Sequence, residues 1–518
     1  RPINKQTSKQ TNNNNKKPKN KMKKIFLSLL VCIMALTASA QVARPKLVVG
    51  LVIDQMRWDY MYYYYDKYGE GGMKRLMAEG FSCDNQMLNY VPTITGVGHS
   101  SIYTGAVPAA NGIPGNDFYL DGKRVYCTDD PDAKGVGTDS KAGCMSPKNM
   151  LGTTIGDMLR CATDFRSKVI GIALKDRASI LPAGHAANAA YWYDKSVAGF
   201  ITSSYYMDAL PDWVKKFNRS SGMKKGYDPK SGSDGVTLTF NMAEAALKNE
   251  QLGKGETPDM LCISISSTDA ISHKTGTWFS PGKENEEVFL TLDRDMKKFF
   301  EALDAQVGKG NYLLFLTADH GGSHNPNTLK EHKLPGGGCD MGAKMRDLNE
   351  KLKAEFGLDI KYAKDIIGES LYLDHDLLAQ NKLCLEKVKA AAIRILKADT
   401  DLQWVIDYEK AAYASAPQWV RERVVNGYYR GRSGDIILMP RINYFEWPVG
   451  KDFYGSSHGT WTPADTHIPL VFMGWNIKPG HTNRQTHMDD TAPTVCSLLH
   501  IQMPDACTGN PIVEVTDK

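Results

Sequence analysis

The chain lacks several patterns that would have pointed to other classes of protein. No two cysteines are spaced as C-x-x-C, so we do not expect a zinc site built from thiolates. The most apolar stretch, residues 25–36, is about 12 residues long, whereas a membrane-spanning helix needs roughly 20. No internal repeat occurs, which excludes a solenoid or propeller.

Acidic side chains are absent from residues 1–40, although this segment holds nine of the 63 basic ones. The remaining chain therefore has 54 basic and 58 acidic residues, and its formal net charge is −4 instead of the +5 of the whole sequence. Because the positive excess belongs to the first 40 residues, it does not support binding to nucleic acid or to an anionic membrane.

Residues 22–40 have the organisation of a secretory signal peptide. A basic start at 22–24 precedes the apolar residues 25–36, and 38–40 read Ala-Ser-Ala, a cleavage signal. We therefore expect residues 1–40 to be removed, with a mature chain that begins near Gln41 and is periplasmic or secreted. Cys32 follows a valine and not the small residue that a lipoprotein signal requires, so no lipid anchor is expected.

The nine cysteines outside this segment leave at least one thiol without an intramolecular partner, because their number is odd. Export makes disulfides possible. Cys127 with Cys144, and Cys496 with Cys507, are close enough in sequence to be considered as pairs.

Buried strands and amphipathic helices alternate along most of the chain. Strands are predicted over 46–54, 168–173, 260–266, 312–317 and 468–473, and helices over 73–79, 149–160, 236–249, 285–303 and 491–499. This alternation predicts an α/β sandwich with a central, mostly parallel sheet and helices on both faces.

Two stretches, about 178–235 and 325–455, break this alternation. We interpret 325–455 as an inserted cap region that contains a helix near 385–398. The catalytic domain would then consist of residues 41–324 and 456–518.

Aspartate and histidine side chains follow three of the predicted strands and occupy one late loop. They are Asp54, Asp269, His273, Asp319, His320 and His458. Zinc prefers such nitrogen and oxygen ligands, and open α/β sheets place their ligands beyond the carboxyl ends of the strands. A single aspartate after a strand is usually a turn or capping residue. The joint occurrence of all six instead predicts a site for two zinc ions.

A threonine lies where a turn enters a helix, in the segment Val91-Pro92-Thr93-Ile94-Thr95-Gly96-Val97-Gly98. Thr95 is the candidate nucleophile, because coordination to zinc can deprotonate its hydroxyl and the neighbouring glycines allow backbone to approach a phosphoryl group. Helix N-terminal amides also favour an anion there. Thr93 is the rival hydroxyl, but we expect Thr93 and His99 to serve in capping or packing.

Seven segments carry a resemblance to the alkaline phosphatase superfamily, and most closely to its flavobacterial PafA-type members. They are LVIDQMRWDY (51–60), NYVPTITGVGHSSIYTG (89–105), GIPGND (112–117), ALKDRASILPAGH (173–185), SSTDAISHKTG (266–276), TADHGG (317–322) and SSHGT (456–460). The resemblance covers roughly residues 45–515. Gly96 departs from it, since such sequences often carry alanine there.

The resemblance implies which residues share each ion. One zinc ion would be held by Asp269, His273 and His458, and the other by Asp54, Asp319 and His320. Thr95 would lie between the ions, bind them and attack phosphorus. Further contacts to the phosphoryl oxygens would come from Asn116, Lys175 and Arg177.

Lys175 and Arg177 decide the expected substrate class. Their positive charge suits a phosphate monoester dianion better than a diester, and an arginine fork can bind two oxygens. The resemblance thus implies an alkaline phosphatase for small phosphorylated substrates, which we expect to be a monomer. Taken alone, these two residues would be read as ordinary loop charge.

Two other functions stay open at this point. The first is a phosphodiesterase or nucleotide pyrophosphatase of the same superfamily. The second, outside enzymes, is a zinc-dependent surface binding protein with a degenerate site. Sulfatases are disfavoured, because the chain has no C/S-x-P-x-R motif.

Overall fold

The computed structural model describes residues 42–280, 282–447 and 453–517. The chain divides into two units, Arg1–Arg44 and Pro45–Lys518, and only residues 42–44 of the first are described. The predicted signal peptide and its cleavage signal lie outside the described residues. Within the described ranges, no helix is long and apolar enough to cross a membrane.

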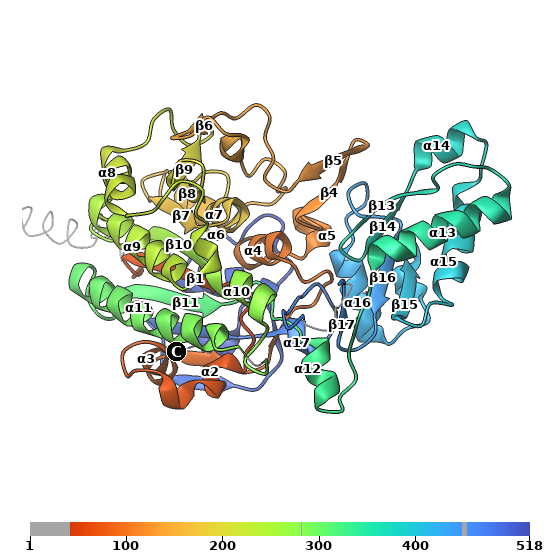
Figure 1. Ribbon diagram of the computed structural model, residues 1–518. Coiled ribbons are helices and arrows are strands. Elements are labelled where there is room, and N and C mark those ends of the chain that lie inside the picture. Colours follow the sequence, from red (N-terminus) through yellow and green to blue (C-terminus); the bar gives the residue numbers. More distant parts are fainter. Residues whose placement is uncertain (1–41, 281, 448–452, 518) are drawn as a thin grey trace, which may run out of the picture. The chain divides into compact units, whose positions relative to one another are not determined.

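A mixed sheet of ten strands forms the centre of the second unit (Figure 1), in the order β20-β2-β19-β11-β1-β10-β7-β8-β9-β6. Its five middle strands are parallel: β11 (Tyr312–Thr317), β1 (Leu47–Ile53), β10 (Asp259–Ile265), β7 (Val169–Ala173) and β8 (Ala189–Asp194). Every residue of β11, β1, β10 and β7 is buried. Burial on both faces explains their continuous apolar sequences and confirms the predicted α/β fold.

The outer strands of this sheet are short. They are β2 (Phe81–Cys83), β6 (Gly135–Val136), β9 (Gly199–Ser203), β19 (Leu470–Gly474) and β20 (Gly480–Thr482). Two small sheets accompany them: β18 (His467–Ile468) with β3 (Gln86–Met87) and β21 (Thr486–His487), and the hairpin of β4 (Asp117–Leu120) and β5 (Lys123–Tyr126).

Helices pack against this sheet in two groups. On one face, α4 (Thr95–Thr104) packs against α7 (Asp176–Ala183), and Gly50 of β1 and Gly171 of β7 leave room for them. On the other face, α9 (Asp234–Asn249) packs against α11 (Glu284–Gln306). This arrangement agrees with the expected sandwich.

The remaining helices of this part are mostly short. They are α2 (Tyr60–Tyr63), η1 (Tyr65–Lys67), α3 (Met73–Glu79), α5 (Pro108–Asn111), η2 (Lys141–Gly143), α6 (Ile155–Ala162), α8 (Asp212–Ser220), η3 (Pro229–Ser231), α10 (Ser267–Thr275), α17 (Pro463–Thr466), η5 (Met488–Asp490), α18 (Thr491–Leu499) and α19 (Val513–Thr516).

Residues 325–455 contain a second sheet with its own apolar core. The antiparallel order is β13-β14-β16-β15, and residues of α13 and α15 pack beside it. The elements are α12 (Pro326–Glu331), β12 (Gly337–Gly338), α13 (Met341–Phe356), β13 (Ala363–Ile367), β14 (Ser370–Leu373), α14 (His375–Gln380), α15 (Leu385–Leu396), β15 (Leu402–Asp407), η4 (Tyr408–Tyr413), α16 (Gln418–Gly427), β16 (Ile436–Pro440) and β17 (Tyr444–Phe445). The division into a catalytic domain and a cap stays a prediction.

The structure bears on several of the finer predictions and shows some of them to be wrong. The alternation does break in the stretch 178–235, where β8 and β9 follow each other as antiparallel strands, but both extend the central sheet. The helix expected from residue 149 begins at Ile155, where Thr154 forms a capping box with Asp157. The strand expected over 468–473 is divided between β18 and β19. All nine cysteines that the structure describes are free, so neither proposed disulfide is present.

Candidate active site

Four candidate site residues follow four neighbouring strands of the sheet. Asp54 comes directly after β1, and Lys175 precedes the first residue of α7, two residues after β7. Asp269 lies in the first turn of α10, just beyond β10, and Asp319 follows β11 by two residues. Because β11, β1, β10 and β7 are adjacent and parallel, these side chains meet at one edge of the sheet.

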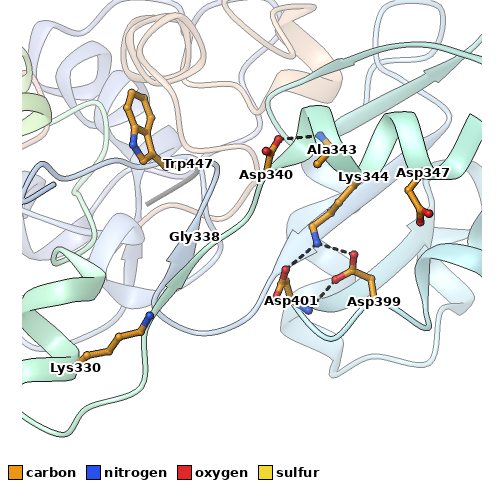
Figure 2. A pocket seen from close by; sticks show the side chains of 9 residues that line it. All are labelled: Lys330, Gly338, Asp340, Ala343, Lys344, Asp347, Asp399, Asp401 and Trp447. Atoms are coloured by element: carbon orange, nitrogen blue, oxygen red, sulfur yellow. Dashed lines mark hydrogen bonds and ion pairs between the residues drawn. The ribbon is translucent and has the colours of Figure 1, made fainter. Parts of the chain in front are cut away.

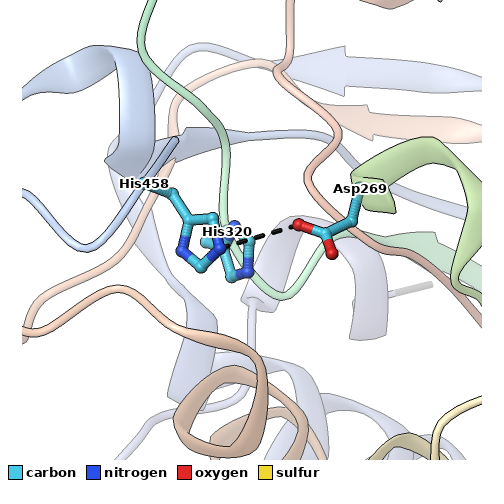
Figure 3. A group of neighbouring side chains, drawn as sticks. All are labelled: Asp269, His320 and His458. Carbon is cyan, nitrogen blue, oxygen red and sulfur yellow. Dashed lines mark ion pairs between the residues drawn. The ribbon is translucent and has the colours of Figure 1, made fainter. Parts of the chain in front are cut away.

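Two groups of side chains there have the geometry of metal ligands. Asp54, Asp319 and His320 offer atoms that all lie within 4.8 Å of one another. Asp269, His320 and His458 form a second such group (Figure 3). His320 belongs to both, and its ring stacks on that of His458 with centroids 3.6 Å apart.

His273 lies beside the second group. Its Nε2 atom is 3.1 Å from Asp269 Oδ1, and its ring centroid is 5.2 Å from that of His458. The structure thus brings all six expected ligand residues together. The expected assignment gives His320 to the ion of Asp54 and Asp319. In the structure, His320 also lies close to Asp269 and His458.

Main-chain carbonyl groups fix the orientation of the three imidazole rings. The Nδ1 atoms lie 2.9 Å from the Ser456 oxygen for His273, 2.8 Å from the Gly321 oxygen for His320 and 2.8 Å from the Thr93 oxygen for His458. When Nδ1 donates to a carbonyl oxygen, Nε2 keeps a lone pair for a metal ion. Each ring is therefore held in a form that can act as a ligand.

Three buried atoms of the first group have no hydrogen-bond partner among the described residues: Asp54 Oδ1, Asp319 Oδ2 and His320 Nε2. A buried polar atom without a partner is costly, and a divalent cation would satisfy two carboxylate oxygens and one imidazole nitrogen at once. The donor set therefore fits a bound metal ion.

The Lys175 ammonium connects the two groups. It donates to Asp54 Oδ2 and to Asp269 Oδ2, both at 2.6 Å. Burial, together with the negative charges of Asp269 and Asp319, raises the pKa of Asp54 to about 8. Burial would also raise the pKa of Asp269, but Lys175 and then His273 outweigh it and hold that pKa well below its usual range.

The first turn of α4 lies directly against the metal-ligand groups. Thr95 is the first residue of this helix and is buried. A side chain at Gly98 would place its Cβ 2.3 Å from the Asp319 oxygen and 2.6 Å from the Asp319 Cβ. The ring of His99 contacts the Thr95 oxygen at 2.9 Å and Asp319 Oδ2 at 3.3 Å. Thr95 and Asp319 are thus held in one packed unit.

The rival hydroxyl of Thr93 is already engaged. Its Oγ1 atom donates to the Thr460 oxygen at 2.9 Å and accepts from the Gly459 nitrogen at 3.1 Å. The Thr95 hydroxyl makes no hydrogen bond to any residue in the described ranges. Thr95 is therefore the better candidate nucleophile.

Asn116 and Arg177 lie beside this helix. Asn116 Oδ1 accepts from the Gly96 nitrogen at 2.7 Å, which places the amide next to Thr95. Arg177 is in the first turn of α7, the helix that packs against α4, and donates through Nη1 to the Tyr126 hydroxyl at 2.9 Å.

Three residues that organise the site carry no recognisable sequence signal: Gln55, Tyr126 and Asp465. Gln55 is buried, adopts a positive φ of 60° and donates its main-chain N–H to Asp319 Oδ1 at 3.1 Å. Asp465 accepts from Thr460 and Ser323. Only the folded contacts reveal these roles, since the partners Asp319, Arg177 and Ser323 are distant in sequence.

A separate cavity of about 520 Å³ lies at residues 330–347, 399–401 and 447 (Figure 2). Two of the aspartates in its wall are already paired, because Lys344 donates to Asp399 at 2.6 Å and to Asp401 at 2.9 Å. We assign no catalytic role to it.

Comparison with known proteins shows the family of this chain. The family model of type I phosphodiesterases and nucleotide pyrophosphatases matches residues 48–458. A protein of Myroides odoratus named calcium-transporting ATPase is 44% identical over 96% of this chain and 100% of its own length. Alkaline phosphatase PafA of Elizabethkingia meningoseptica is 42% identical over 95% of this chain and 99% of its own.

The fold of this family is also confirmed by a solved structure. The crystal structure of wild-type alkaline phosphatase PafA aligns with a TM-score of 0.86 at 41% identity, over 92% of this chain and 99% of that one. The chain therefore belongs to the type I phosphodiesterase and nucleotide pyrophosphatase family of the alkaline phosphatase superfamily. Its similarity to named alkaline phosphatases over most of both chains makes it a phosphoric monoester hydrolase.

Proposed function

We propose that the chain is an exported, zinc-dependent phosphate monoesterase that acts through a covalent phosphothreonine at Thr95. One observation carries the proposal: the ligand residues from three strand ends and a late loop come together against the first turn of the helix that Thr95 begins. The pattern of residues 22–40 supports export.

Two ligand sets support two ions. Asp54, Asp319 and His320 would hold one zinc ion, and Asp269, His273 and His458 the other. The unpartnered atoms of the first set and the fixed rings of all three histidines support this assignment. Bound zinc would lower the pKa of the Thr95 hydroxyl and offset charge on the phosphoryl oxygens.

The chain's own groups would then position and stabilise the phosphoryl group. Thr95 Oγ1 attacks phosphorus in line with the departing oxygen, and a phosphothreonine forms before water hydrolyses it. Asn116 is anchored through its amide oxygen, so its amide nitrogen remains to donate to a phosphoryl oxygen. The N-terminus of α4 also favours the anion. Positioning and charge supply most of the acceleration in such transfers.

Lys175 and Arg177 support a monoester as the substrate. A monoester dianion carries one more negative charge than a diester, and both cations lie at the same edge of the sheet as the ligand groups. Small phosphorylated molecules would be the substrates. A phosphodiesterase or nucleotide pyrophosphatase is the second candidate, favoured by the description of the matching family model.

An activity ratio tests the assignment. Lys175→Ala and Arg177→Ala are each expected to lower kcat/KM for an aryl phosphate by about 100-fold, since removing one donor to a transition-state oxyanion costs that much. Activity on a bis-aryl phosphate should fall far less. Lys195→Ala, at an exposed lysine, is the control. Equal losses on both esters would show that the two residues do not set the substrate class.

A further inference from the structure

We propose that Tyr126 is a positioning residue that holds the Arg177 guanidinium in place for the phosphoryl group. Its hydroxyl connects that guanidinium to the carboxylate of Asp176. The inference rests on the proposed function, because it takes Arg177 as a phosphate-binding residue.

The hairpin of β4 and β5 brings Tyr126 to the site. Strand β4 begins directly after Asn116, and Tyr126, the last residue of β5, pairs with Asp117 across the hairpin. The next residue, Cys127, donates its main-chain N–H to the Asn116 oxygen at 2.8 Å. The hairpin thus leaves the site at Asn116 and returns to it at Tyr126.

Three hydrogen bonds arrange the groups around the phenol. Arg177 Nη1 donates to the Tyr126 hydroxyl, the hydroxyl donates to Asp176 Oδ1, and Thr128 donates to Asp176 Oδ2, each at 2.9 Å. Both carboxylate oxygens are therefore engaged. Since the phenol proton points to Asp176, a lone pair of the same oxygen is available to Arg177.

The protonation state of Tyr126 suits this role. Burial raises the pKa of its hydroxyl well above the usual value, although the Arg177 charge opposes the shift. The phenol thus keeps the proton that it donates to Asp176 at alkaline pH. The Arg177 guanidinium also lies 5.9 Å from the phenol ring centroid, which adds a cation–π attraction.

Arg177 keeps further donors after this contact. Its Nε atom is buried and has no hydrogen-bond partner in the part of the chain that the structure describes. A guanidinium carries five N–H donors in a rigid fork, and Tyr126 takes one of them. Fixing Nη1 limits the rotation of a long side chain and prepares the remaining donors for a phosphoryl group.

Tyr126→Phe tests the proposal, because it removes the hydroxyl and keeps the ring. We expect kcat/KM for an aryl phosphate to fall about tenfold, as for the loss of a hydrogen bond to a charged group. Inhibition by inorganic phosphate should weaken, while bis-aryl phosphate turnover stays within about twofold. In an Arg177→Ala background, Tyr126→Phe should cause no further loss. Tyr205→Phe, whose hydroxyl donates to the His185 oxygen, is the control.

The outcomes separate this inference from the proposed function. A Tyr126→Phe enzyme with wild-type monoesterase activity, or one that loses the same factor in the Arg177→Ala background, would overturn the positioning role. Asp176→Asn is the second variant if Tyr126→Phe does not fold, and the same dependence on Arg177 is expected. A wild-type enzyme that does not hydrolyse the aryl phosphate would instead overturn the proposed function.

Discussion

Gly98 determines how closely the helix that carries Thr95 approaches Asp319. A Cβ atom at this position would overlap the Asp319 main chain at 2.3 Å, and backbone on both sides cannot move aside as a flexible side chain can. The absence of a side chain at Gly98 therefore holds a candidate nucleophile against a candidate metal ligand.

Gly98→Ala should consequently displace α4 from Asp319. We expect aryl phosphate turnover to fall by at least about tenfold, and the free energy of unfolding to fall by about 1–3 kcal/mol because the contact is overpacked. Kinetics and denaturant unfolding would measure both. Gly255→Ala is the matched control, since the nearest atom to its added Cβ is 3.8 Å away. An unchanged Gly98→Ala enzyme would contradict the close approach.

The position of a single residue in the site was predictable where the residue directly follows a buried strand. Asp54 and Asp319 follow buried parallel strands, so the sheet brings them together. Tyr126 and Asp465 act through hydrogen bonds to residues that the tertiary fold, and not a local pattern, makes their neighbours. No spacing rule could have identified them.

The short helix α17 connects two loops that carry candidate metal ligands. Asp465 accepts from the Thr460 nitrogen and hydroxyl at 2.7 and 2.8 Å, which fixes the loop of His458. It also accepts from Ser323 at 2.9 Å, and its own main-chain oxygen accepts from Gly321, next to His320. One carboxylate therefore orients two ligand loops.

Asp465→Asn should weaken metal binding without removing a ligand. An amide has one acceptor oxygen, so it cannot replace the contacts to both loops. We expect zinc affinity to fall about tenfold or more, as for other groups that orient ligands. Zinc titration against a chelator of known affinity measures this loss. Asp208→Asn, at an exposed aspartate, is the control, and equal affinities for both variants would contradict the role of α17.

Long apolar elements were predicted to within a few residues, because burial on both faces leaves a continuous signal. Strand β11 occupies the expected 312–317, and α18 the expected 491–499. Shorter elements were missed or misplaced where a single residue or a packing contact determines their ends. Pro469, which has no N–H group, separates β18 from β19. Gly80, directly after α3, is extended and makes room for Val471 instead of ending the helix in a left-handed turn.

At the scale of the whole molecule, three acidic side chains are buried at one edge of the sheet. Asp54, Asp269 and Asp319 repel one another, and Lys175 compensates only the first two directly. Bound cations would remove this repulsion and connect three strand ends with the late loop of His458. The folded state should therefore depend on metal for stability as well as for activity.

Removal of the metal by a chelator should lower the thermal stability and the activity together. We expect a strong chelator to abolish aryl phosphate turnover and to lower the Tm by on the order of several degrees, because an ion that binds only the folded state stabilises it by mass action. Zinc should restore both. Calorimetry with and without chelator measures the shift. An unchanged Tm in protein shown to have lost its metal would contradict a structural contribution of the ions.

The order of the strands and the second sheet could not be predicted, because both depend on contacts between distant segments. The central order places β19, near the end of the chain, beside β11. The irregular composition of 325–455 indicated an insertion but not its antiparallel sheet. The site was nevertheless predictable, since its residues follow the carboxyl ends of the central parallel strands. Their position does not depend on which strands lie at the outside of the sheet.

The most direct test of the central claim is to stop turnover of an aryl phosphate with acid and to locate phosphate by peptide mass spectrometry. The account predicts phosphate on the peptide that contains Thr95 in the wild type. It predicts neither phosphate nor turnover in Thr95→Ala, which should keep its bound metal. Phosphate on another residue, or undiminished turnover by Thr95→Ala, would contradict the account.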